Sequence, residues 1–118
     1  MIRFIRFCFW AALAFALVMA LLPEPPPLPG SFSDKLQHML AFFTLAVLSS
    51  LAYPRVHPVY MALALFAFGG LIEVAQMAPM LHRSSDMVDW AADMLAATVG
   101  LAGVTVARGL LGTRSPAA

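Results

Sequence analysis

The chain contains 118 residues, of which 62% are hydrophobic and 11% are charged, and its formal net charge is +1. An ordinary soluble domain carries about 25% charged residues. This composition excludes most soluble classes, and the near-neutral charge indicates no particular partner. The apolar stretches take up most of the length, so neither a soluble catalytic domain nor a nucleic-acid-binding domain fits beside them.

Four apolar stretches are each long enough, as helices, to cross a hydrocarbon core about 30 Å thick. We predict an all-α fold, an integral membrane four-helix bundle with short loops that forms one domain over residues 1–118. The predicted spans are residues 4–22, 34–51, 58–77 and 86–108.

The first span ends at the sequence Pro-Glu-Pro-Pro-Pro, which begins at Pro23 and cannot remain helical. Residues 23–33 are predicted to form a Pro-rich outer loop with extended polyproline character. Arg3 and Arg6, followed by sixteen uncharged residues, also resemble a secretory signal. Two alternatives therefore stay open for the first span: a retained anchor, or a signal that is cleaved.

The basic residues predict the orientation, because Lys and Arg in short loops of membrane proteins stay on the cytoplasmic side. One predicted side carries five of them: Arg3, Arg6, Arg55, Arg108 and Arg114. The other side carries Lys35 and Arg83. We therefore predict that both termini are cytoplasmic and that the Pro-rich loop lies outside.

Most other ionisable side chains fall at the outer ends of the second, third and fourth spans. Because consecutive spans alternate in direction, these three ends meet at one membrane face. A charged side chain at depth costs at least about 2.5 kcal/mol on insertion scales, so such residues usually face the bundle and mark a functional site. The candidate ligand-binding residues are Asp34, Lys35, His38, Glu73, Gln76, Arg83, Asp86, Asp89 and Asp93.

Acidic and small residues recur in the fourth span at intervals of three and four residues, which places them in one stripe along a helix. The stripe consists of Asp86, Asp89, Asp93, Ala96, Gly100, Gly103 and Ala107. Small residues allow a neighbouring backbone to approach closely in lipid. We therefore predict that the stripe faces the bundle, with Asp93 as its deepest charge. Gly69 and Gly70 predict a similar close-packed face before Glu73.

Aromatic residues near the predicted span ends are typical of membrane-interface anchors. They are Trp10, Tyr53 and Trp90. The eight methionines stand at scattered positions with no metal-binding spacing, and we expect no metal and no cofactor. The lone Cys8 cannot close a disulfide within the chain.

A further pattern is the order of the polar motifs along the chain, which is carried by Asp34, Lys35, His38, Ala41, Phe42, Glu73, Gln76, Arg83, Asp86, Asp89, Asp93 and Gly100. This order resembles the VanZ-like family, named after an accessory protein of teicoplanin resistance. The resemblance covers about residues 34–103, although many members have Asn at the position of Asp93. It implies a four-helix protein of the cell envelope, in the bacterial cytoplasmic membrane.

Three functions remain open. The first is a non-enzymatic envelope protein whose outer pocket binds a lipid head group or a lipidated glycopeptide such as teicoplanin. Lys35 and Arg83 would then hold phosphate or carboxylate, while the acidic residues would accept hydrogen bonds from amine or hydroxyl groups.

The second function is an intramembrane enzyme that acts on a phospholipid or glycolipid. His38, Glu73, Asp86 and Asp89 would bind a divalent cation, or His38 would act as a base.

The third function is a structural polar clasp for helix packing or partner recruitment, in which the basic residues pair with the acidic ones while His38 and Gln76 satisfy helix ends. The oligomeric state is left open by the sequence.

Overall fold

The computed structural model describes residues 1–21, 34–78 and 87–112, with the backbone alone at residues 34 and 35. These residues form four helices and no strand: α1 (Ile2–Leu21), α2 (Asp34–Ala52), α3 (Pro58–Gln76) and α4 (Met87–Leu110). Each helix begins and ends within two residues of a predicted span. The all-α prediction is therefore confirmed. The predicted loop at residues 23–33 lies outside the described residues, and so do Arg83, Asp86 and Arg114.

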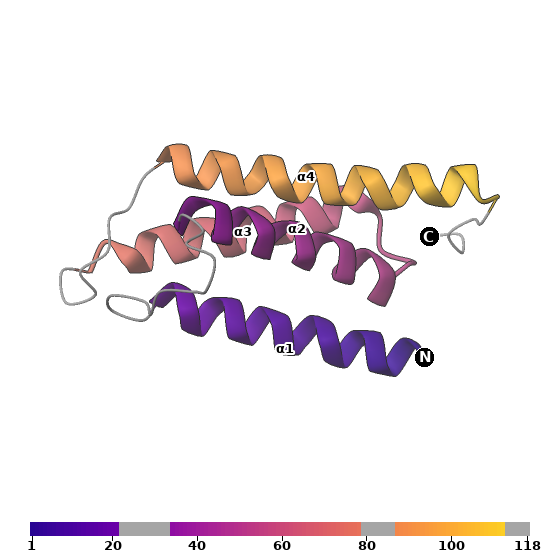
Figure 1. Ribbon diagram of the computed structural model, residues 1–118, viewed down its shortest axis with the longest axis horizontal. Helices are drawn as coiled ribbons and strands as arrows, with labels where there is room; N and C mark the ends of the chain where they lie inside the picture. Colours follow the sequence, from indigo (N-terminus) through magenta and orange to yellow (C-terminus); the bar gives the residue numbers. More distant parts are fainter. Residues whose placement is uncertain (22–33, 79–86, 113–118) are drawn as a thin grey trace.

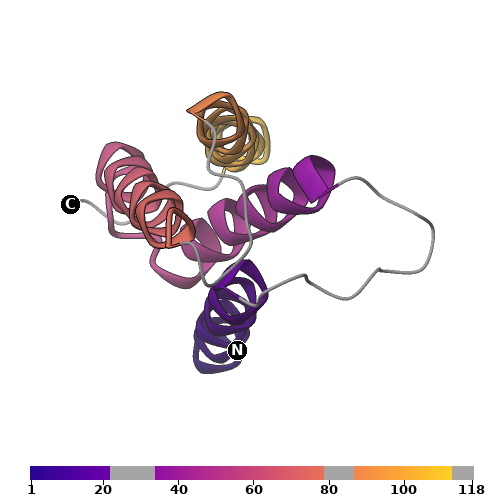
Figure 2. The same ribbon diagram turned by 90° about the vertical axis from the view of Figure 1, so that its left-hand side faces the viewer.

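The helices alternate in direction along the long axis of the bundle (Figure 1). The start of α1, the end of α2, the start of α3 and the end of α4 lie together at the right of the figure. The other four helix ends lie together at the left. A view along the bundle shows α2 inclined to the other three helices (Figure 2).

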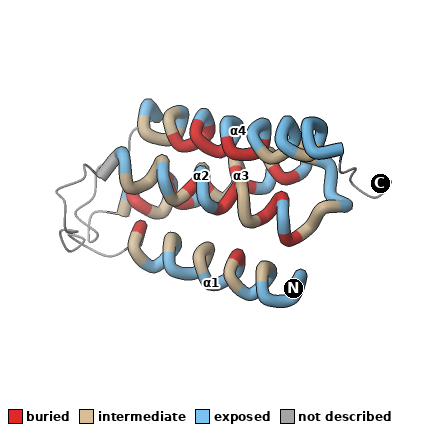
Figure 3. The backbone as a smooth tube through the Cα atoms, turned by 45° about the vertical axis from the view of Figure 1, so that its right-hand side comes forward, coloured by how far each residue is buried: buried red, intermediate tan, exposed pale blue. Residues whose placement is uncertain are grey.

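Helix α2 contacts each of the other helices, most extensively α4. Leu45 and Ser49 on α2 are almost completely buried. The buried Ser49 hydroxyl donates to the carbonyl oxygen of Ala46 at 2.9 Å, so this polar group is satisfied within its own helix. The core therefore lies along α2 (Figure 3).

Three helices are long and apolar enough to cross a membrane: Ile2–Leu21, Pro58–Gln76 and Met87–Leu110. In α2 the described side chains form the apolar segment Leu36–Ala52. The charged residues Asp34 and Lys35 precede this segment.

Helices α2 and α4 approach each other through small residues. A Cβ atom added at Gly100 would lie 3.0 Å from the Cβ of Ala46 and 3.0 Å from the carbonyl oxygen of Phe43. Ala96 and Ala97 are also buried. The middle of the predicted stripe therefore faces the bundle, as expected from its small residues.

The stripe prediction is wrong for Gly103 and Ala107, which are exposed. A Cβ added at Gly103 would meet nothing within 4 Å. Because α2 is inclined to α4 (Figure 2), we infer that the two helices diverge beyond Gly100.

Two arginines contact the C-terminal end of α2, where the last helical carbonyls lack partners within the helix. Nε of Arg6, on α1, donates to the carbonyl oxygen of Ala52 at 2.9 Å. An Nη2 proton of Arg108, on α4, is donated to the carbonyl oxygen of Ser50 at 2.7 Å. A cation at a helix C-terminus is also favoured by the helix dipole. The long side chain of Arg108 therefore connects α4 to α2 where the two helices have moved apart.

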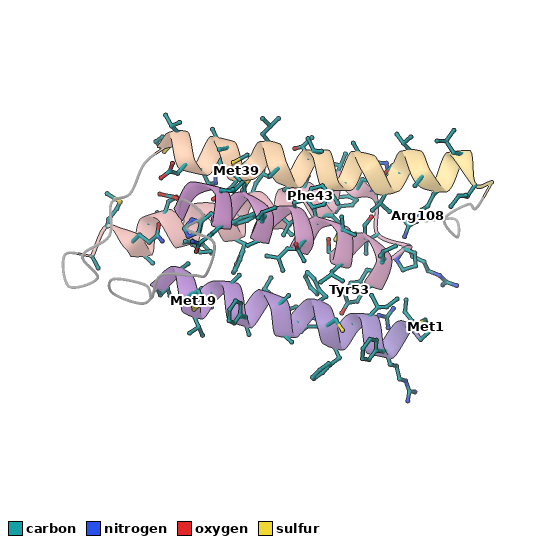
Figure 4. The ribbon with its side chains drawn as sticks, in the orientation of Figure 1. Met1, Met19, Met39, Phe43, Tyr53 and Arg108 are labelled. Atoms are coloured by element: carbon teal, nitrogen blue, oxygen red, sulfur yellow. The ribbon has the colours of Figure 1, made fainter. Side chains whose placement is uncertain are left out.

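An aromatic group lies at the same end of the bundle. The guanidinium carbon of Arg6 is 4.7 Å from the centre of the Tyr53 ring, within the range of a cation–π interaction. Trp10 donates from Nε1 to the Tyr53 hydroxyl at 2.8 Å. Figure 4 shows Tyr53 and Arg108 towards the end where α2 finishes. Helices α1, α2 and α4 are therefore joined by polar contacts here.

Gly100→Ala and Gly103→Ala form a matched pair that tests the contact between α2 and α4. Both changes gain the same helix propensity, but only the methyl group at residue 100 meets neighbouring atoms. We expect Gly100→Ala to be less stable than Gly103→Ala by about 1 to 3 kcal/mol. Unfolding in detergent micelles, followed by circular dichroism during a dodecyl sulfate titration, measures the difference. Equal stabilities would contradict the close approach.

Candidate functional site

Five of the predicted site residues have side chains that the structure describes, and they come from three helices. His38 lies near the start of α2, Glu73 and Gln76 lie at the end of α3, and Asp89 and Asp93 lie in the first half of α4. These three helix ends lie at the end of the bundle opposite the start of α1 and the end of α4 (Figure 1). The prediction that distant segments meet at one end therefore agrees with the helix arrangement.

Two other predicted residues, Asp34 and Lys35, are placed by their backbone in the first turn of α2, at this same end. The remaining two, Arg83 and Asp86, lie outside the described residues.

The contacts around Gly69 set the axial level of the three helices. A Cβ atom added at Gly69 would lie 2.7 Å from Cε of Met94, 3.2 Å from Cζ of Phe42 and 3.3 Å from Cδ1 of Trp90. Gly69 therefore lies at the level of Phe42 on α2 and of residues 90–94 on α4. The absence of a side chain at this glycine allows the close approach.

This level places the ionisable residues relative to one another. His38 precedes Phe42 by four residues, and Glu73 follows Gly69 by four residues. Because α3 runs opposite to α2, His38 and Glu73 are displaced from the level of Gly69 towards the same end of the bundle. Each lies about 6 Å from that level, at 1.5 Å per residue. Asp89 directly precedes Trp90 and belongs to the same layer. Asp93 lies about one turn deeper, as the sequence predicted.

Burial differs among these side chains. Glu73 is 8% exposed and Asp93 is 3% exposed, whereas His38 and Asp89 are half-buried. A buried carboxyl group is costly unless it has polar partners. Each of the four residues has at least one interaction partner in the protein. In addition to that partner, Asp93 presents a buried Oδ1 atom that receives no hydrogen bond from the described part of the chain.

Gln76 joins two helix ends. Its side chain is 3% exposed, and Nε2 donates to the carbonyl oxygen of Ala20 at 2.8 Å. Ala20 lies in the last turn of α1, where carbonyls lack partners within the helix. Gln76 therefore has the helix-end role that the structural clasp expects.

Trp90 packs inside the bundle, although the sequence analysis assigned it to the membrane interface. Its Nε1 donates to the carbonyl oxygen of Phe66 at 3.3 Å, and the Trp90 ring packs edge-on against Phe66 with the centroids 6.4 Å apart. The signal that could have found this role is the position of Trp90, four residues before Met94 and on the same face of α4. Trp90 therefore forms part of the apolar layer beneath Glu73.

Metal binding was one of the alternatives for this cluster. Within residues 1–21, 34–78 and 87–112, no group of three or more His, Cys, Asp or Glu side chains is arranged to hold a metal ion. Asp86, one of the four suggested ligands, lies outside these ranges.

Comparison of the chain with known protein families, with curated proteins and with solved structures finds no match. The resemblance to the VanZ-like family therefore stays a prediction. The interpretation of the site depends on the side chains and the helix arrangement.

Gln76→Leu tests whether the cluster also holds the bundle together. The change keeps a similar volume but removes the donor to Ala20, so we expect a loss of about 1 kcal/mol in the free energy of unfolding. The same dodecyl sulfate titration measures it. Val74→Ala, at an exposed neighbouring position, is the control. Unchanged stability of Gln76→Leu would show that this hydrogen bond does not help to hold α1 against α3.

Proposed function

We propose that this chain is a four-span protein of the bacterial cytoplasmic membrane. The outward faces of the helices support this proposal, because they carry large apolar side chains such as Phe7, which is 70% exposed, and Leu71, which is 69% exposed. Soluble monomers rarely expose apolar patches larger than a few hundred Å². Lipid would cover these side chains.

The proposed orientation places both termini in the cytoplasm. The described arginines support it, because Arg3, Arg6, Arg55 and Arg108 all lie at the end of the bundle that holds the start of α1. The buried carboxylates lie at the opposite end, which would face outwards.

Cysteine labelling in intact cells tests this orientation. In a Cys8→Ser background, we expect Met77→Cys to react with a membrane-impermeant maleimide and Val56→Cys to remain unlabelled. Both positions are exposed and lie at opposite ends of α3. Permeabilised cells provide the control, in which both variants should react. Labelling of Val56→Cys alone in intact cells would reverse the orientation.

We call the five described site residues the outer cluster: His38, Glu73, Gln76, Asp89 and Asp93. We propose that the outer cluster binds the polar head group of a lipid or of a lipidated glycopeptide. The supporting observation is that three helices bring the ionisable residues His38, Glu73 and Asp89 to about one level, with Asp93 beneath them, at one end of an apolar bundle. Ionisable groups at such depth usually mark a functional site. A purely apolar layer would pack the same helices without this cost.

The carboxyl groups of the outer cluster are suited to a ligand that donates hydrogen bonds. Carboxylate oxygens accept from amine and hydroxyl groups, and charge-assisted bonds of this kind are about twice as strong as neutral ones. Sugars and peptides offer such donors, and the apolar helix faces would hold an acyl chain. Lys35 and Arg83 are proposed to bind phosphate or carboxylate. The resemblance to the VanZ-like family supports a glycopeptide such as teicoplanin as one ligand.

A structural clasp is the second candidate, and the hydrogen bond from Gln76 to Ala20 favours it. In this alternative the polar residues hold the helix ends in place and recruit no ligand. The two candidates differ in their consequences, because a clasp mutation lowers the folded yield, whereas a ligand-site mutation lowers binding in a folded protein.

Native mass spectrometry of the protein purified with its own membrane lipids separates the two candidates. We expect the wild type to carry a specific lipid adduct and His38→Ala and Glu73→Gln to lose about tenfold in retention. A charged hydrogen bond is worth about 1.5 to 3 kcal/mol, and about 1.4 kcal/mol corresponds to tenfold. His57→Ala, which changes a histidine at the opposite end of the bundle, is the matched control.

The contrary outcome is equally specific. If no specific adduct is found and both His38→Ala and Glu73→Gln fold poorly, the cluster is a structural clasp. If both variants fold and retain the lipid as the wild type does, the adduct binds elsewhere on the protein.

A further inference from the structure

Four arginines surround the C-terminal end of α2, and we call this group the arginine end. Arg3 and Arg6 are three residues apart on α1 and share a helix face. Arg55 follows α2 in the turn that leads to α3, and Arg108 lies in the last turn of α4. The chain thus brings arginines from three separate segments to one place.

Two of these arginines are fixed in place by the fold. Arg6 and Arg108 donate to the carbonyl oxygens of Ala52 and Ser50, which are only two residues apart in the last turn of α2. Arg6 uses its Nε for this bond and remains exposed, so the two terminal nitrogens of its guanidinium group can donate outwards. The contacts with α2 therefore hold a cationic group in a defined position.

The other two arginines have no such structural role. Arg3 and Arg55 are exposed, and neither side chain makes a hydrogen bond or ion pair within the described part of the chain. The acidic side chains that the structure describes, Glu73, Asp89 and Asp93, all lie towards the opposite end of the bundle. Among the described residues, no carboxylate neutralises the arginine end.

The aromatic pair at this end indicates its environment. Trp10 is 55% exposed and donates from Nε1 to the hydroxyl of Tyr53. An exposed tryptophan with a polar partner is typical of the head-group level of a bilayer. Arg3 and Arg6 lie closer to the start of α1 than Trp10 does, so they would lie among the head groups rather than in the hydrocarbon.

We propose that the arginine end binds the head group of an anionic phospholipid in the leaflet on the side of the two termini. A phosphodiester accepts hydrogen bonds from the planar fork of donors that each guanidinium group presents. Anionic lipids of a cytoplasmic leaflet attract basic segments that lie next to a transmembrane helix. The inference depends on the proposed membrane insertion, but it concerns a different site and ligand from those of the outer cluster.

The double variant Arg3→Gln/Arg55→Gln tests this site without removing a contact that holds the fold. Each protein is exchanged into an equimolar mixture of phosphatidylglycerol and phosphatidylcholine, and the retained lipids are counted by native mass spectrometry. We expect the wild type to retain phosphatidylglycerol preferentially and the double variant to lose this preference by at least fivefold. Circular dichroism checks that the double variant has the wild-type helix content.

A competition with inorganic phosphate and a control variant identify the ligand and the site. Inorganic phosphate at millimolar concentration is expected to leave the phosphatidylglycerol in place, and its displacement by phosphate would overturn a lipid as the ligand. Val74→Ala, an exposed position near the end of α3 and outside both proposed sites, is expected to keep the wild-type preference.

An equal preference for phosphatidylglycerol in the wild type and the double variant overturns the proposal for the arginine end. That result leaves the outer cluster untouched, since its own test depends on His38 and Glu73. Failure of the protein to retain any lipid would instead contradict the membrane insertion on which both proposals depend.

Discussion

The close approach of three helices at Gly69 and Gly100 is the constraint on which the rest of the structure depends. Atoms of α2 and α4 occupy the space that a Cβ at Gly69 would need, and atoms of α2 occupy the space beside Gly100. The level of each helix along the bundle is therefore set by contacts between apolar and small residues. The positions of the ionisable residues one turn away follow from that level, because a helix rises by a constant distance per residue.

Helix α2 separates two polar ends of opposite charge. The first half of α2 contains His38, which lies at about the same level as Glu73 and Asp89. The last turn of α2 accepts hydrogen bonds from Arg6 and Arg108. Both ends are built by residues from other helices that meet α2. The same helix carries the almost completely buried residues Leu45 and Ser49, and it contacts each of the other helices. The proposed head-group sites at the two ends both follow from this arrangement.

Most of the helix boundaries could be predicted, because proline and charged residues interrupt the apolar stretches at Pro23, Asp34 and Pro58. The meeting of the candidate residues at one end of the bundle could be predicted too, because consecutive spans alternate in direction. The outward position of Gly103 could not, because it depends on the inclination of α2 to α4. The capping roles of Arg6 and Gln76 were also beyond a one-dimensional pattern, since their partners lie 46 and 56 residues away.

The sequence by itself determined that the chain is helical, where each helix lies, and which end of the bundle holds the acidic residues. These properties depend on local hydrophobicity, on proline and on chain direction. The tertiary structure alone decided which partners the side chains of Trp90, Gln76, Arg6 and Arg108 contact, and how far Glu73 is buried. The physical reason is that helices can pack at several levels and inclinations with the same apolar faces. Only the detailed contacts at Gly69 and Gly100 select one of them.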